Sequence, residues 1–314
     1  MFNIKLNSIL GVVILLWCIF SFRINNNLRM TNKLSHIIES HYWNKDYHDT
    51  IKVPRDIYMR DYFQFMDSLV CRYDSLTSYP LSEHLLVRAN PWIIDVLTQT
   101  DYYTRMAQDS IVYDQKQMII LPNETHLIVP DLKKAQELFK IFSNTTIDVN
   151  IPEYKLRIKN RSSIYYEFLV RVGRHEEKYL EMSGRLEDLR TKTGEGTIIG
   201  YNRFPRYVNP ANNAEYYVTR RDDGRVTKLP QIPFIETELN GKRYGQLIHP
   251  TTNPETLGKA YSNGCIGTSE ADAWVIYYYA PIGTTITIRY DLNVVNAKGD
   301  TIQLEDIYNY KQQY

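Results

Sequence analysis

A cysteine and a histidine in the C-terminal half of the chain have the residue types needed for nucleophilic chemistry. Cys265 ends a turn of small and polar residues, Ser262-Asn263-Gly264-Cys265, and His249 ends an apolar run upstream. A thiol attacks as the thiolate, and a neutral imidazole within hydrogen-bond reach can take its proton. Gly264 has no Cβ, so the backbone can turn sharply there and leave the Gly264 and Cys265 N–H groups facing a reacting carbonyl oxygen. The segment therefore predicts a thiol nucleophile, its base and a main-chain oxyanion hole.

The same stretch resembles the active-site segment of the L,D-transpeptidases, the YkuD family. That family's pattern reads roughly H-G-T-x-x-P-x-x-(I/L)-G-x-x-x-S-H-G-C-(I/V)-R. The positions that match it without a gap are His249, Thr251, Pro254, Leu257, Gly258, Ser262, Gly264, Cys265 and Ile266. Further stretches resemble strands and a helix of the catalytic domain, namely 149–157, 168–173, 191–196, 272–273 and 283–288. The chain thus looks like an L,D-transpeptidase with a variant S-N-G-C-I-G motif.

Three positions depart from the family pattern. Asn263 replaces a histidine, Gly267 replaces an arginine and Pro250 replaces a glycine. Asn263 can hydrogen-bond but cannot titrate, and the family's base is the upstream histidine, here His249. Pro250 keeps the carbonyl through which the family orients that base. Gly267 removes a guanidinium fork for a substrate carboxylate, so we expect the specificity to differ.

The resemblance implies a two-step acyl transfer. His249 would take the proton of Cys265, which would attack a peptidoglycan stem tetrapeptide at the carbonyl before its terminal D-residue. The Gly264 and Cys265 amides would hold the oxyanion, and Ser262 would brace the turn. An amine of a neighbouring stem would then resolve the thioester into a cross-link, with no metal or cofactor. A carbapenem is expected to acylate the same thiol.

Two alternatives stay open at this point. One is a thiol-dependent wall-peptide hydrolase, an L,D-carboxypeptidase, because acceptor choice depends on the pocket and not on the nucleophile. The other is a catalytically inactive wall-binding protein that kept the fold after losing the arginine and the second histidine. Acylation by a carbapenem separates the inactive protein from both enzymes, and analysis of wall peptides separates the two enzymes.

Composition limits the other function classes. The 314 residues carry a formal net charge of +1, so no global field favours nucleic acid as a partner. The chain has no Cys-x-x-Cys or His-Glu-x-x-His pattern, which argues against zinc. Of its three cysteines, Cys18 lies in an N-terminal apolar run. A thiol nucleophile requires Cys71 and Cys265 to be unbridged, and we expect Cys71, in a helical pattern, to be buried.

The elements that must position these residues indicate an α+β fold. We expect a mainly β, YkuD-like sandwich or barrel with a short helix, preceded by a mostly helical domain. The predicted divisions are a membrane anchor or signal segment at 1–30, a helical domain with a small hairpin at 31–145, a catalytic domain at 146–292 and a tail at 293–314. The hairpin is predicted from the apolar runs 118–121 and 126–129, which flank a turn-forming stretch.

Local signals define several of these elements more closely. An apolar stripe in 57–70 predicts an amphipathic helix, and Asn90-Pro91 predicts the capped start of another helix over 92–98. Asp131 predicts the N-cap of a helix that reaches about residue 142. Asp222-Asp223-Gly224 predicts a hairpin turn within a flap at 215–245. Ser269 predicts the N-cap of a helix whose dipole would favour the Cys265 thiolate if the two lie close.

The apolar run at 9–20 predicts export from the cytoplasm. It is intermediate in length between a signal-peptide core and a membrane span, and no Ala-x-Ala site follows it, which favours an uncleaved anchor. Arg23, Arg29 and Lys33 follow the run, against the usual bias for an outward-facing body. We expect an inner-membrane-anchored or secreted protein of the cell envelope, with a periplasmic or extracytoplasmic catalytic domain, because the implied substrate lies there.

Overall fold

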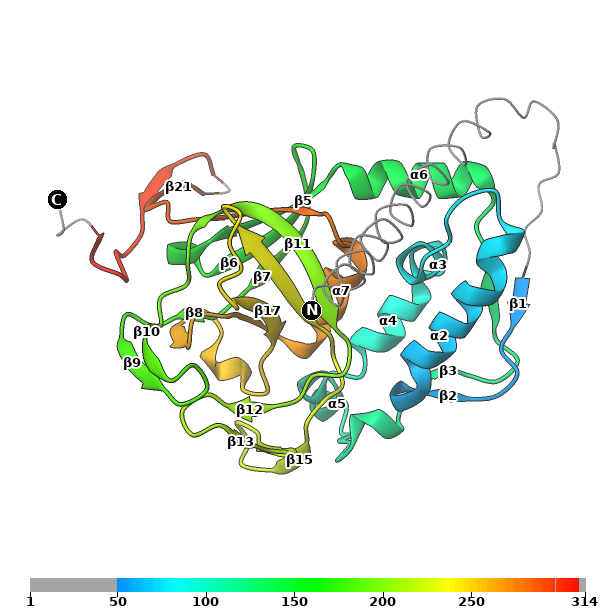
Figure 1. Ribbon diagram of the computed structural model, residues 1–314, viewed down its shortest axis with the longest axis horizontal. Coiled ribbons are helices and arrows are strands. Elements are labelled where there is room, and N and C mark those ends of the chain that lie inside the picture. The colour runs from blue at the N-terminus through cyan, green and yellow to red at the C-terminus, as the bar shows by residue number, and fades with distance from the viewer. Residues whose placement is uncertain (1–49, 297, 311–314) are drawn as a thin grey trace, which may run out of the picture. The chain divides into compact units, whose positions relative to one another are not determined.

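Short helices precede a mixed β-sheet in the computed structural model (Figure 1), which describes residues 50–296 and 298–310. The predicted anchor at 9–20 lies outside these residues. No helix within the described ranges has the length and apolar character needed to cross a membrane. All described residues belong to one compact unit.

The helical part is built from amphipathic segments. The predicted amphipathic helix is confirmed as α2, but its buried face is Met59, Tyr62, Phe63, Met66 and Leu69, while Ile57 and Tyr58 of the predicted stripe form strand β2. The helices of this part are α2 (Met59–Tyr73), α3 (Glu83–Ala89), α4 (Trp92–Thr98), α5 (Tyr102–Ala107) and α6 (Leu132–Ser143), with 3₁₀ turns η1 (Asp74–Leu76) and η2 (Gln115–Gln117). The Asp131 side chain accepts from Lys134 N–H and caps α6, as predicted.

The predicted hairpin in the helical part is wrong. Its two runs are strands, β3 (Ile119–Leu121) and β4 (His126–Ile128), but they do not pair with each other. Instead β4 pairs with β1 (Thr50–Lys52), and β3 pairs with β2 (Ile57–Tyr58). Both partners come from the start of the described chain, and a sequence window around the turn contains neither of them.

Asn90 has a different role from the predicted one. The helix α4 has the predicted bounds, but the residue at its N-cap is Pro91, which provides no side-chain hydrogen bond. The Asn90 side chain donates to Leu86 O and Ile128 O and accepts from Ile128 N–H. Asn90 thus ends α3 and ties it to β4.

An eight-stranded mixed sheet forms the second part, in the order β19-β17-β16-β11-β20-β5-β6-β7. Neighbouring strands are antiparallel except β17 with β19 and β20 with β5, which are parallel. The strands are β5 (Thr145–Asn150), β6 (Lys155–Asn160), β7 (Ser163–Leu169), β11 (Gly194–Asn202), β16 (Phe234–Leu239), β17 (Leu247–Pro250), β19 (Ile266–Thr268) and β20 (Thr285–Arg289). The helix α7 (Glu270–Tyr279) follows β19 in the chain. The sheet and this helix confirm the expected α+β fold with a mainly β domain.

Arg171 joins the two edges of this sheet. The edge strand β7 ends at Leu169, and Arg171, two residues further on, forms an antiparallel bridge with Gly267 in the opposite edge strand, β19. Each of the two residues donates its N–H to the carbonyl of the other at 2.9 Å. The sheet is therefore nearly closed into a barrel, with its seam at Arg171 and Gly267.

Smaller ladders surround the sheet. They are formed by β8 (Val172–Gly173) with β18 (Ala260–Ser262), β9 (Glu177–Leu180) with β10 (Arg185–Asp188), β12 (Val208–Asn209) with β13 (Ala214–Glu215), β14 (Val218–Arg220) with β15 (Val226–Lys228), and β21 (Asn293–Val295) with β22 (Thr301–Gln303). Two more 3₁₀ turns are η3 (Ile151–Glu153) and η4 (Pro254–Thr256). The predicted turn at 222–224 connects β14 and β15, whereas 234–239, expected within the flap, is the central strand β16.

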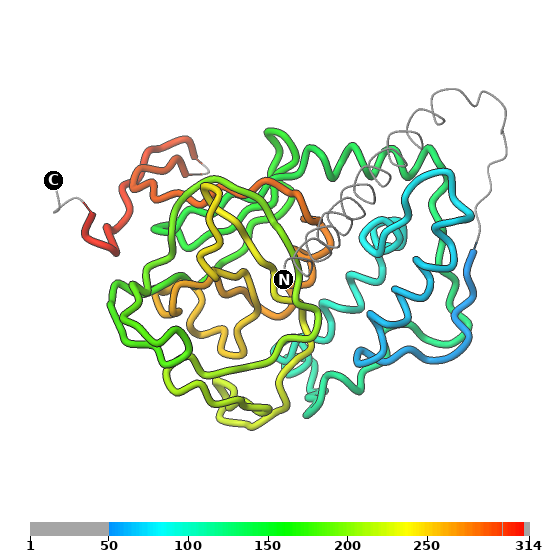
Figure 2. Tube along the Cα trace, viewed as in Figure 1, coloured from blue at the N-terminus to red at the C-terminus, as the bar shows by residue number. Residues whose placement is uncertain are grey.

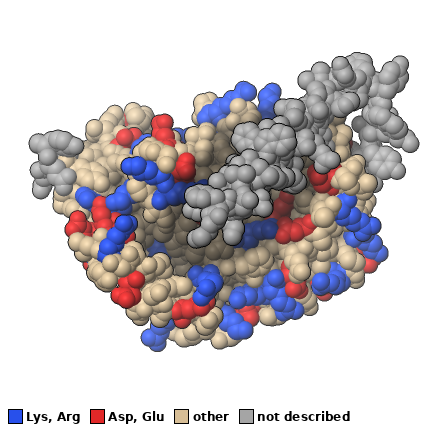
Figure 3. Space-filling view, viewed as in Figure 1, with Lys and Arg blue, Asp and Glu red and all other residues tan. Residues whose placement is uncertain are grey.

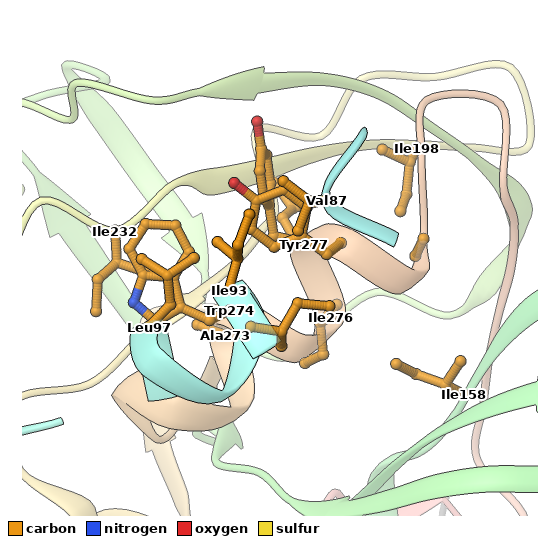
Figure 4. Close-up of a cluster of buried hydrophobic side chains, with 14 of the residues drawn as sticks. Val87, Ile93, Leu97, Ile158, Ile198, Ile232, Ala273, Trp274, Ile276 and Tyr277 are labelled. Atoms are coloured by element: carbon orange, nitrogen blue, oxygen red, sulfur yellow. The ribbon is translucent and has the colours of Figure 1, made fainter. Parts of the chain in front are cut away.

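The two parts share one hydrophobic core. Figure 4 shows side chains of α7, α3, α4, β6 and β11 gathered into a single cluster, with Trp274 near Leu97. Trp274 and Tyr277 are fully buried, so α7 presents large aromatic groups to the helical part. A polar network lies beside them, in which Glu83 of α3 accepts from Tyr278 OH and Arg203. The helical part therefore packs against α7 and the sheet through a shared core.

The described residues after β20 contain regular structure and a buried side chain. Figure 2 shows the β21–β22 hairpin (red) on the side of the sheet away from α2. Beyond this hairpin, Tyr308 is completely buried. The predicted tail thus includes a hairpin and an anchoring aromatic residue.

Charged side chains of both signs are interspersed on the face shown in Figure 3. Several are paired across elements, as in Arg203 with Asp67 and Lys228 with Asp114. This mixed surface agrees with the near-neutral net charge of the chain.

Candidate active site

Two neighbouring strands position His249 and Cys265. In the parallel pair β17–β19, Ile248 is opposite Ile266 and His249 is opposite Gly267. Side chains alternate between faces along a strand, so His249 and Gly267 share the face opposite to the buried Ile248 and Ile266. Cys265 lies in the bend directly before β19, where a backbone hydrogen bond from Leu247 of β17 reaches its thiol. The predicted base therefore lies on β17, and the predicted nucleophile lies at the start of the neighbouring strand.

His249 is held as a neutral imidazole. Its Nδ1 lies 2.9 Å from Pro250 O, and a carbonyl only accepts, so Nδ1 carries the proton and Nε2 is left as the acceptor. The ring packs on Phe234, with centroids 4.8 Å apart. Burial, and next the charge of Arg171, lower the pKa of His249 to about 4 against the opposing effect of the Pro250 hydrogen bond. The imidazole is thus neutral at pH 7, with its proton on Nδ1 and its orientation fixed by Pro250.

The turn before Cys265 is held by Ser262. Its Oγ donates to Cys265 O and accepts from Gly264 N–H at 3.2 Å. Gly264 has φ +107°, in the region that glycine adopts without strain. The Gly264 N–H is therefore engaged by Ser262 in this structure, whereas we had expected it to be free for an oxyanion.

The Cys265 thiol is not polarised by a helix terminus. The strand β19 separates it from α7, whose first residue is Glu270, so the expected assistance from the helix dipole does not arise. Burial raises the pKa of the Cys265 thiol, and a backbone hydrogen bond from Leu247 and the charge of Arg171 counteract part of this increase. The raised pKa of Cys265 and the lowered pKa of His249 both favour the neutral form of these groups at rest.

Both cysteines of the described residues are free, as a thiol nucleophile requires. The prediction that Cys71 is buried is wrong, because its side chain is exposed on α2. It lies on the polar side of that helix, and apolar neighbours at three and four residues do not determine the side on which a cysteine falls.

A chain of hydrogen bonds links the turn to the C-terminal segment. Thr191 Oγ1 donates to Gly264 O at 3.0 Å and accepts from Gly173 N–H at 2.7 Å. The buried Tyr308 hydroxyl donates to Gly173 O at 2.6 Å and accepts from Thr191 N–H at 3.1 Å. The position of Gly264 is therefore supported by Thr191 directly and by Tyr308 of the C-terminal segment through Thr191 and Gly173.

Asn263 points away from this buried chain. It is exposed, and its Oδ1 accepts from Arg174 Nη2 at 2.6 Å. Asn263 thus stands at the rim of the site and touches neither His249 nor Cys265 through any recorded hydrogen bond.

A buried ion pair anchors the β14–β15 hairpin to α7. Arg221, at its turn, forms a fully buried ion pair with Glu270 at the start of α7. Glu270 also accepts from Tyr102 N–H and from Gln115 Nε2, both in the helical part. The hairpin is therefore fixed at its base to both parts of the fold.

Arg171 is the site residue that the sequence reading missed. Its charge acts on the pKa of both Cys265 and His249, and it lies against Gly267. The stretch 168–173 had been interpreted only as a strand. One feature of the sequence pointed to Arg171. Position 267 lacks the arginine of the family pattern, so an arginine elsewhere in the chain was to be expected near Cys265.

The arrangement has the parts that nucleophilic catalysis uses: a thiol, an oriented imidazole, a left-handed glycine turn and a nearby cation. A comparison with protein families matches residues 144–288 to YkuD, described as the L,D-transpeptidase catalytic domain. Residues 144–288, somewhat less than half of the chain, are thus similar to the catalytic domain of the YkuD family. No curated protein matches the chain.

Solved structures of L,D-transpeptidases are distant likenesses. One from Mycobacterium smegmatis is 13% identical, with TM-score 0.31, over 46% of this chain and 58% of the other. L,D-transpeptidase 3 from Mycobacterium tuberculosis, in complex with a faropenem-derived adduct, is 14% identical, with TM-score 0.30, over 46% and 60%. That of Xylanimonas cellulosilytica is 11% identical, with TM-score 0.35, over 76% and 97%. The chain spans less than two thirds of the length of the first two.

Proposed function

We propose that this protein is an L,D-transpeptidase that uses Cys265 as its nucleophile on peptidoglycan stem peptides. The observation that carries the proposal is that His249 lies on β17 and Cys265 directly precedes its parallel partner β19, within the residues that match YkuD. The hydrogen bond from His249 Nδ1 to Pro250 O supports it further, because it leaves Nε2 free to accept a proton.

In the first step, Nε2 of His249 takes the thiol proton as Sγ attacks the carbonyl carbon before the terminal D-residue. The resulting imidazolium returns this proton to the leaving amine as the C–N bond breaks, which leaves a thioester on Cys265. The resting thiol has a raised pKa, so attack and proton transfer occur together and no preformed thiolate is needed.

In the second step, an amine of a neighbouring stem attacks the thioester and loses its proton to His249. The Cys265 sulfur leaves and takes that proton back, which restores the resting site. Water in place of the amine would give carboxypeptidation. The backbone N–H of Cys265 is the candidate oxyanion donor, because that of Gly264 is bound to Ser262.

We also propose that the reaction takes place outside the cytoplasmic membrane, where wall peptides are accessible. This rests on the apolar run at 9–20, which precedes the described residues. Fractionation of cells that produce the full chain tests it, and recovery in the soluble cytoplasm would contradict it.

A mass measurement tests the nucleophile. The full chain is mixed with a carbapenem and weighed intact, beside Cys265→Ala and the matched control Cys71→Ser. We expect an adduct on the wild type and on Cys71→Ser, and none on Cys265→Ala. A folded wild-type protein that gains no mass would overturn the proposal.

Wall-peptide analysis then tests the reaction. Purified protein is incubated with disaccharide tetrapeptides, and the products are separated and weighed. Dimers joined through the third residue of the donor support transpeptidation, whereas trimmed monomers alone would assign the hydrolase.

A further inference from the structure

Position 267 has a glycine where the family pattern has an arginine, and the side chain of Arg171, from the opposite edge of the sheet, lies next to this glycine. A Cβ built on Gly267 would lie 2.5 Å from Arg171 Nε and 2.6 Å from Arg171 Cγ. The Arg171 side chain thus occupies the space into which a residue at 267 would project. The two residues are also bridged through their backbones, which fixes this arrangement at the seam.

The same geometry places Arg171 beside the candidate nucleophile. A side chain at 267 would point to the same face of the sheet as His249, because Gly267 is the register partner of His249. Arg171 is therefore on that face, and its charge acts on both of these groups.

Arg171 has little to neutralise its charge. Its Nη1 donates to Thr256 Oγ1 at 3.3 Å, and its Nε is buried without a hydrogen-bond partner. The ionisable groups that act on it most are Cys265, Tyr216, Tyr261 and Arg174, none of which is a carboxylate. No ion pair to Arg171 is recorded among the described residues. A buried guanidinium without an acidic partner is costly unless an anion binds to it.

We propose that Arg171 binds the substrate carboxylate next to the scissile bond, in place of an arginine at position 267. This inference rests on the proposed function. The anion is the terminal carboxylate of the D-residue that leaves, which is separated from the scissile carbonyl only by one amide nitrogen and one Cα. A planar guanidinium can hold that group through two parallel hydrogen bonds.

The test compares two donor peptides that differ only at the C-terminus. One ends in a free carboxylate and the other in a carboxamide, and thioester formation is followed by mass and rate for the full chain. We expect the wild type to prefer the carboxylate donor by about 10- to 100-fold in kcat/KM, the usual effect of a hydrogen-bonded charge.

Arg171→Gln should bring the ratio of kcat/KM for the two donors close to one, and because this is a ratio, any general effect of the lost charge on Cys265 and His249 cancels. Arg171→Lys should retain part of the preference, because it keeps the charge without the fork. Arg243 is an exposed arginine in the connection between β16 and β17, and Arg243→Gln is the matched control that should retain all of the preference.

A second variant separates binding from folding. Arg171→Ala with Gly267→Arg places the guanidinium on the other strand, and we expect part of the preference to return. If both donors acylate the wild-type protein at equal rates, the role of Arg171 is overturned and the proposed function stands. If neither donor nor a carbapenem acylates the wild-type protein, the proposed function itself is overturned.

Discussion

Arg171 and Gly267 exchange two backbone hydrogen bonds of 2.9 Å, and the side chain of the first covers the second. This contact closes the sheet between β7 and β19. It also sets a cation beside Cys265 and His249. One pair of residues therefore contributes to both the fold and the electrostatics of the site.

Replacement of Gly267 by alanine should destabilise the protein through a steric clash. We expect a loss of about 1–3 kcal/mol in the free energy of unfolding, because the new methyl group meets Arg171 in a packed seam. In an Arg171→Ala background the same substitution should cost less than half as much. Urea unfolding of the four proteins of this cycle measures the coupling, and strictly additive effects would contradict the clash.

The acid limit of activity should reflect His249. Its pKa is lowered to about 4, so the base is neutral above that pH and becomes protonated as the pH falls through it. We expect kcat/KM for acylation to persist to about pH 5 and then to fall. Arg171→Gln removes a positive neighbour and should shift this limb to higher pH. A wild-type limb near 6.5, with the fold intact by circular dichroism, would be inconsistent with the buried, neutral imidazole.

The Cys265 thiol should be slow to alkylate at neutral pH. Burial raises its pKa, so the thiolate fraction is small and the rate should keep rising with pH above the usual range for a free cysteine. Iodoacetamide labelling must be done on protein with Cys18 and Cys71 both replaced by serine, so that Cys265 is the one remaining thiol of the three in the sequence. Rapid labelling of Cys265 at pH 6 would instead indicate a preformed thiolate.

The buried pair Arg221–Glu270 should couple the hairpin to the helical part. Arg221→Ala or Glu270→Ala leaves one buried charge without its partner, and each should cost about 3–5 kcal/mol of stability. Arg221→Met combined with Glu270→Leu should be less damaging than either single change. Arg206→Ala, which breaks an exposed ion pair with Glu215, is the control and should have little effect. Thermal unfolding of these variants decides the point.

Tyr308→Phe should loosen the turn that precedes Cys265. The change removes the hydroxyl that joins Gly173 O and Thr191 N–H, at a cost of about 1–3 kcal/mol for the groups left unpaired. Because Thr191 holds Gly264 O, acylation should slow by roughly 10-fold through misplacement of the thiol. The exposed Tyr244→Phe should behave as the wild type. Unchanged stability and rate in Tyr308→Phe would separate the C-terminal segment from the site.

Local sequence was sufficient to predict the elements that are stabilised by interactions between residues close in the chain. The stripe in α2, the bounds of α4, the Asp131 cap of α6 and the hairpin turn at 222–224 depend on residues a few positions apart. The motif around Cys265 was found in the same way. Its resemblance to the L,D-transpeptidases also led to the expected fold class, which the YkuD match and the sheet confirm.

Only the tertiary structure showed the features that depend on contacts between residues far apart in the chain. The runs that became β3 and β4 looked like a hairpin, but their partners are β2 and β1. Cys71 fell on the exposed side of its helix, and Gly264 N–H was taken up by Ser262. Arg171 could be recognised only after the sheet had closed, because Gly267 lies far from it in sequence and no local pattern joins them. The sequence by itself determined which residues could do the chemistry, and the closure of the sheet determined which charge lies beside them.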